Sequence, residues 1–133
     1  MGAKAASSSV SRLLRSVALV QGGYYAVTGF WPLASVETFQ LITGRKRDIW
    51  LVKTAGSLIG IIGCVLALAG WRRAVTPETL LLGAGSAAGL AAVDLVYVRR
   101  RVIGRIYLAD AAAEIGLVAL WGAGTLTRRR SRR

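Results

Sequence analysis

Long apolar stretches alternate along the chain with short blocks of basic residues. Four stretches are long enough to cross a bilayer as helices, which takes about 20 residues at 1.5 Å each. They cover residues 16–34, 49–70, 79–98 and 106–127. The pattern predicts an all-α fold, an integral membrane four-helix bundle, with residues 1–133 forming a single membrane domain.

The connection between the first two stretches has the signals of a short helix. Ser35 can cap such a helix, Glu37 would lie in its first turn and Gly44 would end it. We expect a short helix at the membrane interface, and the alternative is an ordered loop. The other two connections are short, so consecutive helices should be antiparallel neighbours.

The charge of the chain is concentrated outside the apolar stretches. The formal net charge is +12, from 18 Lys and Arg against 6 Asp and Glu, although 54% of the residues are hydrophobic. Basic residues occupy the connections and a tail at 128–133, where they would meet anionic lipid headgroups. We therefore expect the lipid bilayer as a partner, and no nucleic acid. Lys and Arg are somewhat more numerous on the side shared by both termini, which favours a multi-pass plasma-membrane protein with cytoplasmic termini.

Small residues recur at four-residue spacing inside three of the stretches. Such spacing lets helices approach closely in lipid, although Gly and Ala are frequent enough here for any pair to be incidental. The pairs are Gly56 and Gly60, Gly85 and Gly89, and Ala112 and Gly116. Similar faces can also join copies of the chain, so a homo-oligomer or a larger membrane assembly is compatible with the sequence.

Four ionisable side chains lie inside the predicted spans, where a charge is costly and usually has a role. All four fall in the half of the bilayer next to the first and third connections, and Glu114 is the deepest, at roughly 12 Å along its helix. Asp110 and Glu114 are four residues apart and so share a face. The residues expected to bind a ligand or a proton are Glu114, Asp110, Asp94, Lys53, Tyr24, Tyr25 and Tyr107.

This concentration of polar residues has two interpretations. One is a polar pocket open toward the first and third connections, with Arg45–Arg47 and Arg99–Arg105 around its mouth. The other is that Lys53, Asp94 and Asp110 pair with arginines of the connections and only anchor the helices.

Glu114 is too deep to reach the headgroups. We expect its side chain to face the bundle interior, where it would be protonated, paired with Lys53, or hydrogen-bonded to Tyr24 or Tyr25.

The chemistry that a carboxylate pair supports leaves two classes of function open. Two acids one turn apart tend to hold a proton between them, which suits a small binding or transport module, or an accessory subunit of a larger assembly. The alternative is a membrane enzyme of the isomerase or cyclase type, with Asp110 and Glu114 as catalytic acid and base on a lipophilic substrate. The chain has no His and a single cysteine, Cys64, and it lacks GxSxG and Walker-type motifs. We therefore expect no metal and no cofactor.

Part of the chain resembles a group of known proteins. The runs Gly23–Leu33 and Asp48–Val52, with Phe39-Gln40 and Thr43-Gly44 between them, look like uncharacterised small bacterial four-helix membrane proteins. The layout is also similar to DoxX-like proteins, in helix number and size. These resemblances imply a bacterial membrane protein and transfer no activity and no functional residue. Small multidrug exporters carry their essential acid in the first span, and the absence of an acid from this first span argues against that family.

Overall fold

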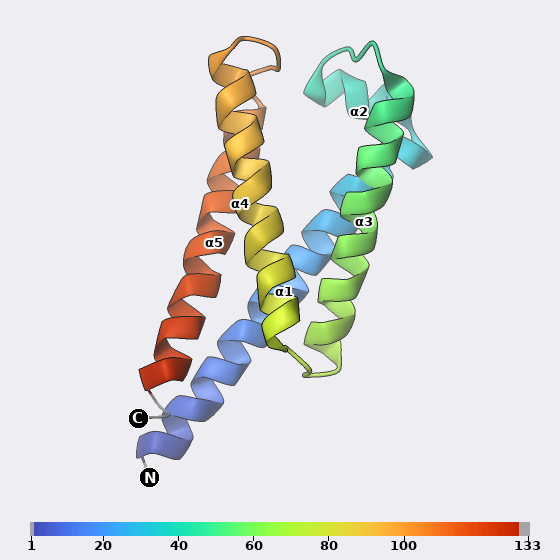
Figure 1. The fold of residues 1–133 in the computed structure, drawn as a ribbon. Helices are drawn as coiled ribbons and strands as arrows, with labels where there is room; N and C mark the ends of the chain where they lie inside the picture. The colour runs from blue at the N-terminus through green and yellow to red at the C-terminus, as the bar shows by residue number, and fades with distance from the viewer. Residues whose placement is uncertain (1, 131–133) are drawn as a thin grey trace.

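The computed structural model describes residues 2–130, which form five helices and no strand (Figure 1). The helices are α1 (Gly2–Ala34), α2 (Val36–Thr43), α3 (Ile49–Trp71), α4 (Pro77–Arg99) and α5 (Tyr107–Arg130). The prediction of an all-α fold is confirmed, and each long helix coincides with one predicted stretch. The α1 helix starts 14 residues before residue 16 of the first predicted stretch, since the helix begins at Gly2 (16 − 2 = 14). The Ala- and Ser-rich segment that leads into this stretch therefore continues the helix.

The predicted short helix is confirmed as α2, and the loop alternative is excluded. Ser35 has an extended backbone, and its hydroxyl accepts a hydrogen bond from the Thr38 amide at 3.3 Å. Gly44, with φ +87°, ends the helix in a conformation that suits glycine, and its amide donates to the Gln40 carbonyl. The position of α2 at a membrane interface remains a prediction.

The four long helices form two pairs. α1 packs along α3, and α4 packs along α5 (Figure 1). α1 also crosses α5, whereas α3 and α4 make few contacts, so α1 joins the two pairs. The ends of the described chain lie near each other at one end of the molecule, which we call the terminal end (Figure 1). The connections after α2 and after α4 lie at the opposite end, which we call the connection end.

Glycines bring the backbones of α1 and α3 into direct contact. Gly56, Gly60 and Gly63 are all buried on α3. A methyl group added at Gly63 would overlap the backbone of Ala26 and lie 2.7 Å from the Gly22 carbonyl oxygen. The predicted role of the first small-residue pair in helix packing is therefore confirmed.

The other two small-residue pairs make no such contact within the chain. Gly85, Gly89 and Gly116 have nothing within 4 Å of a built Cβ atom among residues 2–130. The buried face of α4 instead carries Gly83, Ala87, Ala91 and Asp94. The spacing could not distinguish these faces, because Gly and Ala occur on every side of α4.

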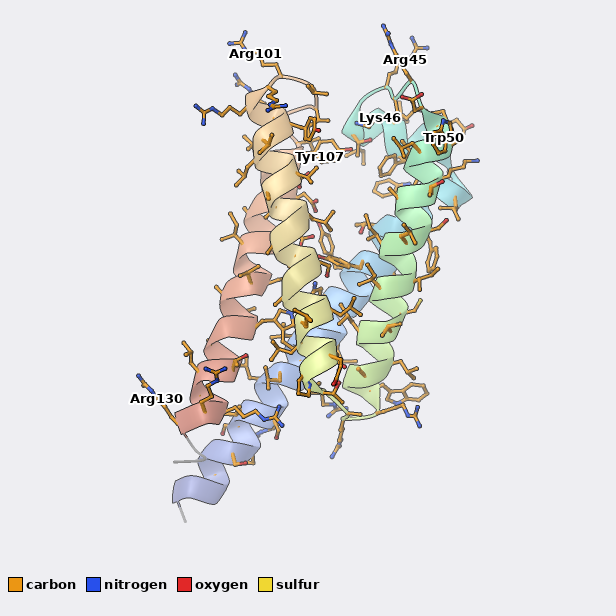
Figure 2. All side chains as sticks on the ribbon, viewed as in Figure 1. Arg45, Lys46, Trp50, Arg101, Tyr107 and Arg130 are labelled. Atoms are coloured by element: carbon orange, nitrogen blue, oxygen red, sulfur yellow. The ribbon has the colours of Figure 1, made fainter. Side chains whose placement is uncertain are left out.

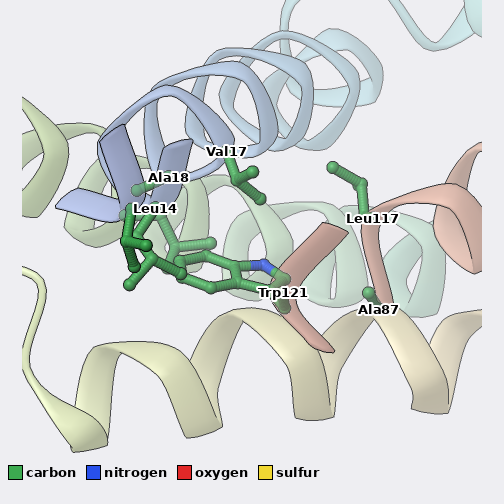
Figure 3. Packing of buried hydrophobic residues seen from close by; sticks show 8 residues of the cluster. Leu14, Val17, Ala18, Ala87, Leu117 and Trp121 are labelled. Carbon is green, nitrogen blue, oxygen red and sulfur yellow. The ribbon is translucent and has the colours of Figure 1, made fainter. Parts of the chain in front are cut away.

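An apolar core fills the terminal end. It is built by side chains of α1, α3, α4 and α5 around the indole of Trp121 (Figure 3). The labelled members are Leu14, Val17, Ala18, Ala87, Leu117 and Trp121.

Two of the helices in the described part of the chain, α3 and α4, are long and apolar enough to cross a membrane. α1 and α5 are of comparable length but more polar. α1 carries Gln21, Tyr24 and Tyr25, and α5 carries Asp110 and Glu114. Length and composition therefore support membrane crossing for two helices, α3 and α4. Membrane crossing by α1 and α5 remains a prediction.

Candidate binding cavity

A cavity of about 460 Å³ lies between the two helix pairs at the connection end. All five helices contribute to its wall, which is mostly apolar or aromatic. Examples are Trp31, Phe39, Val52, Ile59, Leu90 and Ile106. A cavity of this size falls within the range of small-molecule binding sites.

Two tyrosines of α1 hold two carboxyl groups of α5 on one wall of the cavity. The Tyr24 hydroxyl donates to Asp110 Oδ1, and the Tyr25 hydroxyl donates to Glu114 Oε2 at 2.7 Å. The tyrosines are consecutive on α1 and the acids are one helical turn apart on α5, so the two hydrogen bonds join the same stretches of these two helices. Hydrogen bonds of this kind offset much of the cost of placing carboxyl groups among apolar side chains.

Asp94 of α4 lies behind this pair, next to Asp110. Its residue is 5% exposed, and its Oδ2 atom has no hydrogen-bond partner among the described residues. A buried oxygen without a partner costs free energy. Asp94 Oδ2 is therefore the oxygen of this cluster that could still accept a hydrogen bond.

Lys46 and Tyr107 lie at the mouth of the cavity (Figure 2). The Lys46 ammonium is 4.8 Å from the centre of the Tyr107 ring and donates to the Thr43 carbonyl at 3.0 Å. Of the two basic blocks expected around the mouth, Arg45–Arg47 and Arg99–Arg105, Lys46 is the residue that lines the cavity. Arg45 and Arg101 point outward beyond the mouth in Figure 2.

Lys53 lies apart from this group. Its side chain is exposed on α3 and does not line the cavity, and it is not the partner of Glu114. The reason is the rotation of α3, because Val52, the residue before Lys53, lines the cavity while Lys53 itself is exposed. Of the three states expected for Glu114, the structure has the hydrogen bond to tyrosine.

Gln21 makes a second polar contact, one helical turn before Tyr25 on α1. The sequence did not predict its partners. The Gln21 amide donates to the Gly83 carbonyl at 2.8 Å and accepts from the Trp121 indole at 2.7 Å. These bonds connect α1, α4 and α5 at the border between cavity and apolar core. A glutamine near the middle of a predicted span indicated a buried polar contact. Its partner could not be predicted, because the sequence does not give the rotation of each helix about its axis.

The cavity offers hydrogen-bond acceptors in an apolar setting. Within residues 2–130, no group of three or more His, Cys, Asp or Glu side chains is arranged to hold a metal ion. Thr28 also lines the cavity, but its hydroxyl donates to the Tyr24 carbonyl at 2.7 Å. A ligand here would meet two carboxyl groups, aromatic rings and one ammonium group at the mouth.

Comparison of the chain with protein-family models, with curated proteins and with solved structures finds no match.

Proposed function

We propose that this is an integral membrane protein in which all four long helices cross the bilayer, and that its cavity binds an amphipathic small molecule. The observation that carries the membrane assignment is the inverted distribution of side chains. Large apolar residues project outward from all four helices, including Val27 of α1 at 69% exposed and Leu81 of α4 at 73%. Beside the apolar core around Trp121, the buried positions hold many Gly and Ala residues together with Gln21 and Glu114. Bilayer-embedded bundles have this pattern, and water-soluble domains rarely expose so much contiguous apolar surface.

The ends of α3 supply a second argument. Trp50 and Trp71 are 70% and 74% exposed, and they bracket the helix. Exposed tryptophans at both ends of an apolar helix are typical of the two membrane interfaces. Figure 2 labels Trp50 beside Arg45, at the level where headgroups would begin.

The polar residues of α1 and α5 are compatible with crossing because they face each other. Tyr25 and Glu114 are buried together, and Gln21 is buried against Trp121. Charges and hydroxyls that pair inside a bundle do not meet lipid, so the cost of inserting them is largely avoided.

The ligand class follows from the chemistry of the wall. Apolar side chains such as Ile59 and Leu90 suit a hydrocarbon part, and the Asp110 and Glu114 carboxyl groups suit a head group that donates hydrogen bonds or carries a positive charge. Such a site fits a small binding or transport module, or an accessory subunit of a larger assembly. A cytoplasmic location of both termini is part of the same proposal.

Binding is favoured over catalysis by the placement of the acids. A catalytic acid or base must come within hydrogen-bond reach of the proton that it transfers. Here Asp110 and Glu114 lie on the same helix face, and each accepts a hydrogen bond from its own tyrosine. This arrangement suits the recognition of a head group better than proton transfer across a substrate.

Cysteine labelling from the two sides of the membrane tests the number of spans. In a Cys64→Ala background, single cysteines would replace Ser7, Arg47, Thr76 and Gly104. Four crossing helices place Ser7 with Thr76 on one side, and Arg47 with Gly104 on the other. If only α3 and α4 cross, Ser7 will be labelled from the same side as Arg47, which would refute the four-span proposal.

Binding of three alkyl probes tests the cavity. Dodecylamine, dodecanol and dodecanoate share one hydrocarbon chain and differ in the head group. We expect dodecylamine to bind the protein in detergent most tightly, and Glu114→Gln to weaken its binding by about tenfold, the effect of one lost charge-assisted hydrogen bond. Lys53→Gln is the matched control, outside the cavity, and should leave binding unchanged. Equal binding of dodecanoate, or no effect of Glu114→Gln, would contradict the proposal.

A further inference from the structure

A second cavity, of about 480 Å³, lies at the terminal end of the molecule. It is formed by the first half of α1, the connection between α3 and α4, and the last turn of α5. Four arginines line it: Arg12, Arg15, Arg73 and Arg128. No Asp or Glu among the described residues lines this cavity, and Arg12, Arg15 and Arg73 bring three guanidinium groups to its wall.

Two of the arginines are placed there by the backbone. Arg15 Nε donates to the Gly70 carbonyl at 3.1 Å, which fixes its guanidinium beside the end of α3. Arg73 has φ +56°, the left-handed conformation that follows a helix end and usually belongs to glycine. The Ala74 amide donates to the Ala69 carbonyl at 2.9 Å and holds this turn closed.

The end of α4 provides an internal comparison. Arg101 has φ +59° and follows α4 as Arg73 follows α3, and the Val102 amide closes the same turn by donating to the Tyr97 carbonyl at 2.9 Å. Arg101 points outward and lines neither cavity (Figure 2). The same turn therefore presents an arginine to a cavity at one end of the molecule and to the outside at the other.

We propose that the terminal cavity is a binding site for a phosphoryl group. Guanidinium groups donate paired hydrogen bonds that match phosphate oxygens, and several of them around one recess favour a group with more than one oxygen and a negative charge. The neighbouring Trp71, exposed at the end of α3, places the recess at the level of lipid headgroups in the four-span arrangement. The phosphoryl group can come from a phospholipid headgroup or from free phosphate.

Native mass spectrometry of the full chain in mild detergent tests this site. The probes are phosphatidylglycerol, diacylglycerol, which has the same chains without phosphate, and inorganic phosphate. We expect phosphatidylglycerol to bind in preference to diacylglycerol. Arg73→Gln should raise its apparent Kd about tenfold, the effect of losing one charge-assisted contact. Arg101→Gln removes the same charge from the equivalent turn and should change Kd by less than twofold.

Competition between the probes distinguishes a phospholipid headgroup from free phosphate as the bound group. Competition by inorganic phosphate with the same dependence on Arg73 assigns the site to free phosphate, and its failure to compete assigns it to the lipid headgroup. If Arg73→Gln lowers thermal stability, the exposed Arg12→Gln replaces it. Equal weakening by Arg101→Gln, or no weakening by either Arg73→Gln or Arg12→Gln, would overturn the proposal. Glu114→Gln, at the other end of the molecule, should have no effect, so this result is independent of the proposed binding cavity.

Discussion

The two ends of the helical bundle are built from the same four long helices but bury very different groups. At the terminal end, apolar side chains pack around Trp121, and the cavity of about 480 Å³ at that end is lined by arginines and by no acid among the described residues. At the connection end, the same helices separate around about 460 Å³ of space and line it with two carboxyl groups. The Gln21–Trp121 hydrogen bond lies at the border between the two regions. The comparison teaches that the terminal end holds the bundle together, so that the connection end is free to remain open.

The helix contacts explain how one end opens. α1 packs on α3 over glycines, and it also crosses α5, so it fixes both pairs at its middle. α3 and α4 make few contacts with each other. Beyond the crossing point the two pairs diverge toward the connection end, as Figure 1 shows. Changes in the tight region should therefore affect stability most, and changes in the open region should affect binding most.

The largest loss of stability is expected from Gly63→Ala. A methyl group there would overlap the α1 backbone at Ala26, and neither backbone can move without separating the helices. We expect a loss of about 1–3 kcal/mol or more in the free energy of unfolding. Gly89→Ala is the control, since nothing among residues 2–130 lies near its built Cβ atom, and it should be neutral or slightly stabilising. Thermal unfolding in detergent would measure both, and equal effects would contradict the assigned interface.

A loss of comparable size is expected at the border of the two regions. Trp121→Phe removes the indole donor and leaves the Gln21 carbonyl oxygen without that partner, which costs about 1–3 kcal/mol. Gln21→Leu removes the acceptor as well as the bond to Gly83. A double-mutant cycle should give a coupling energy of about 0.6 kcal/mol and at most about 1.7 kcal/mol, the average and the maximum for hydrogen bonds between membrane helices. Strict additivity of the two substitutions would show that this hydrogen bond does not contribute.

At the connection end we expect binding to change more than stability. Tyr25→Phe removes the donor to Glu114 Oε2 but keeps the ring in place. The free energy of unfolding should fall by about 0.5–1.5 kcal/mol, while the affinity for dodecylamine should change severalfold because the carboxyl group is no longer held. Tyr97→Phe, on the exposed side of α4, is the control. The account fails here if Tyr25→Phe changes only stability and leaves the affinity at the wild-type value.

The smallest effect is expected for Lys53→Gln. The side chain is exposed on α3 and does not line the cavity. We expect a change within about 0.5 kcal/mol in the free energy of unfolding, as for other surface substitutions. A loss above about 2 kcal/mol would show that Lys53 is paired in the membrane, as one of the sequence-based alternatives holds.

The sequence predicted the helices well because their signals are local. Ser35 and Gly44 mark the ends of α2, and the apolar stretches mark the long helices. Which residues meet depends instead on the rotation of each helix about its axis, which the spacing does not encode. Asp110 and Glu114 could be placed on one face because both belong to α5. The Gln21–Trp121 contact joins two helices, so it could not be predicted. Lys53 was grouped with the acids by its depth alone, and the rotation of α3, which turns Val52 toward the cavity and leaves Lys53 exposed, separates it from them.

Three single cysteines in a Cys64→Ala background, labelled in intact membranes with a small water-soluble thiol reagent, test the central claim most directly. Thr28 lines the cavity, its neighbour Val27 is exposed on the outer face of α1, and Ala87 is buried in the apolar core. The account predicts rapid labelling at position 28 and protection at positions 27 and 87, by lipid and by packing respectively. Labelling at position 27 as fast as at position 28 would show that α1 lies in water. Protection of all three positions would show that the proposed binding cavity is as closed to water as the apolar core.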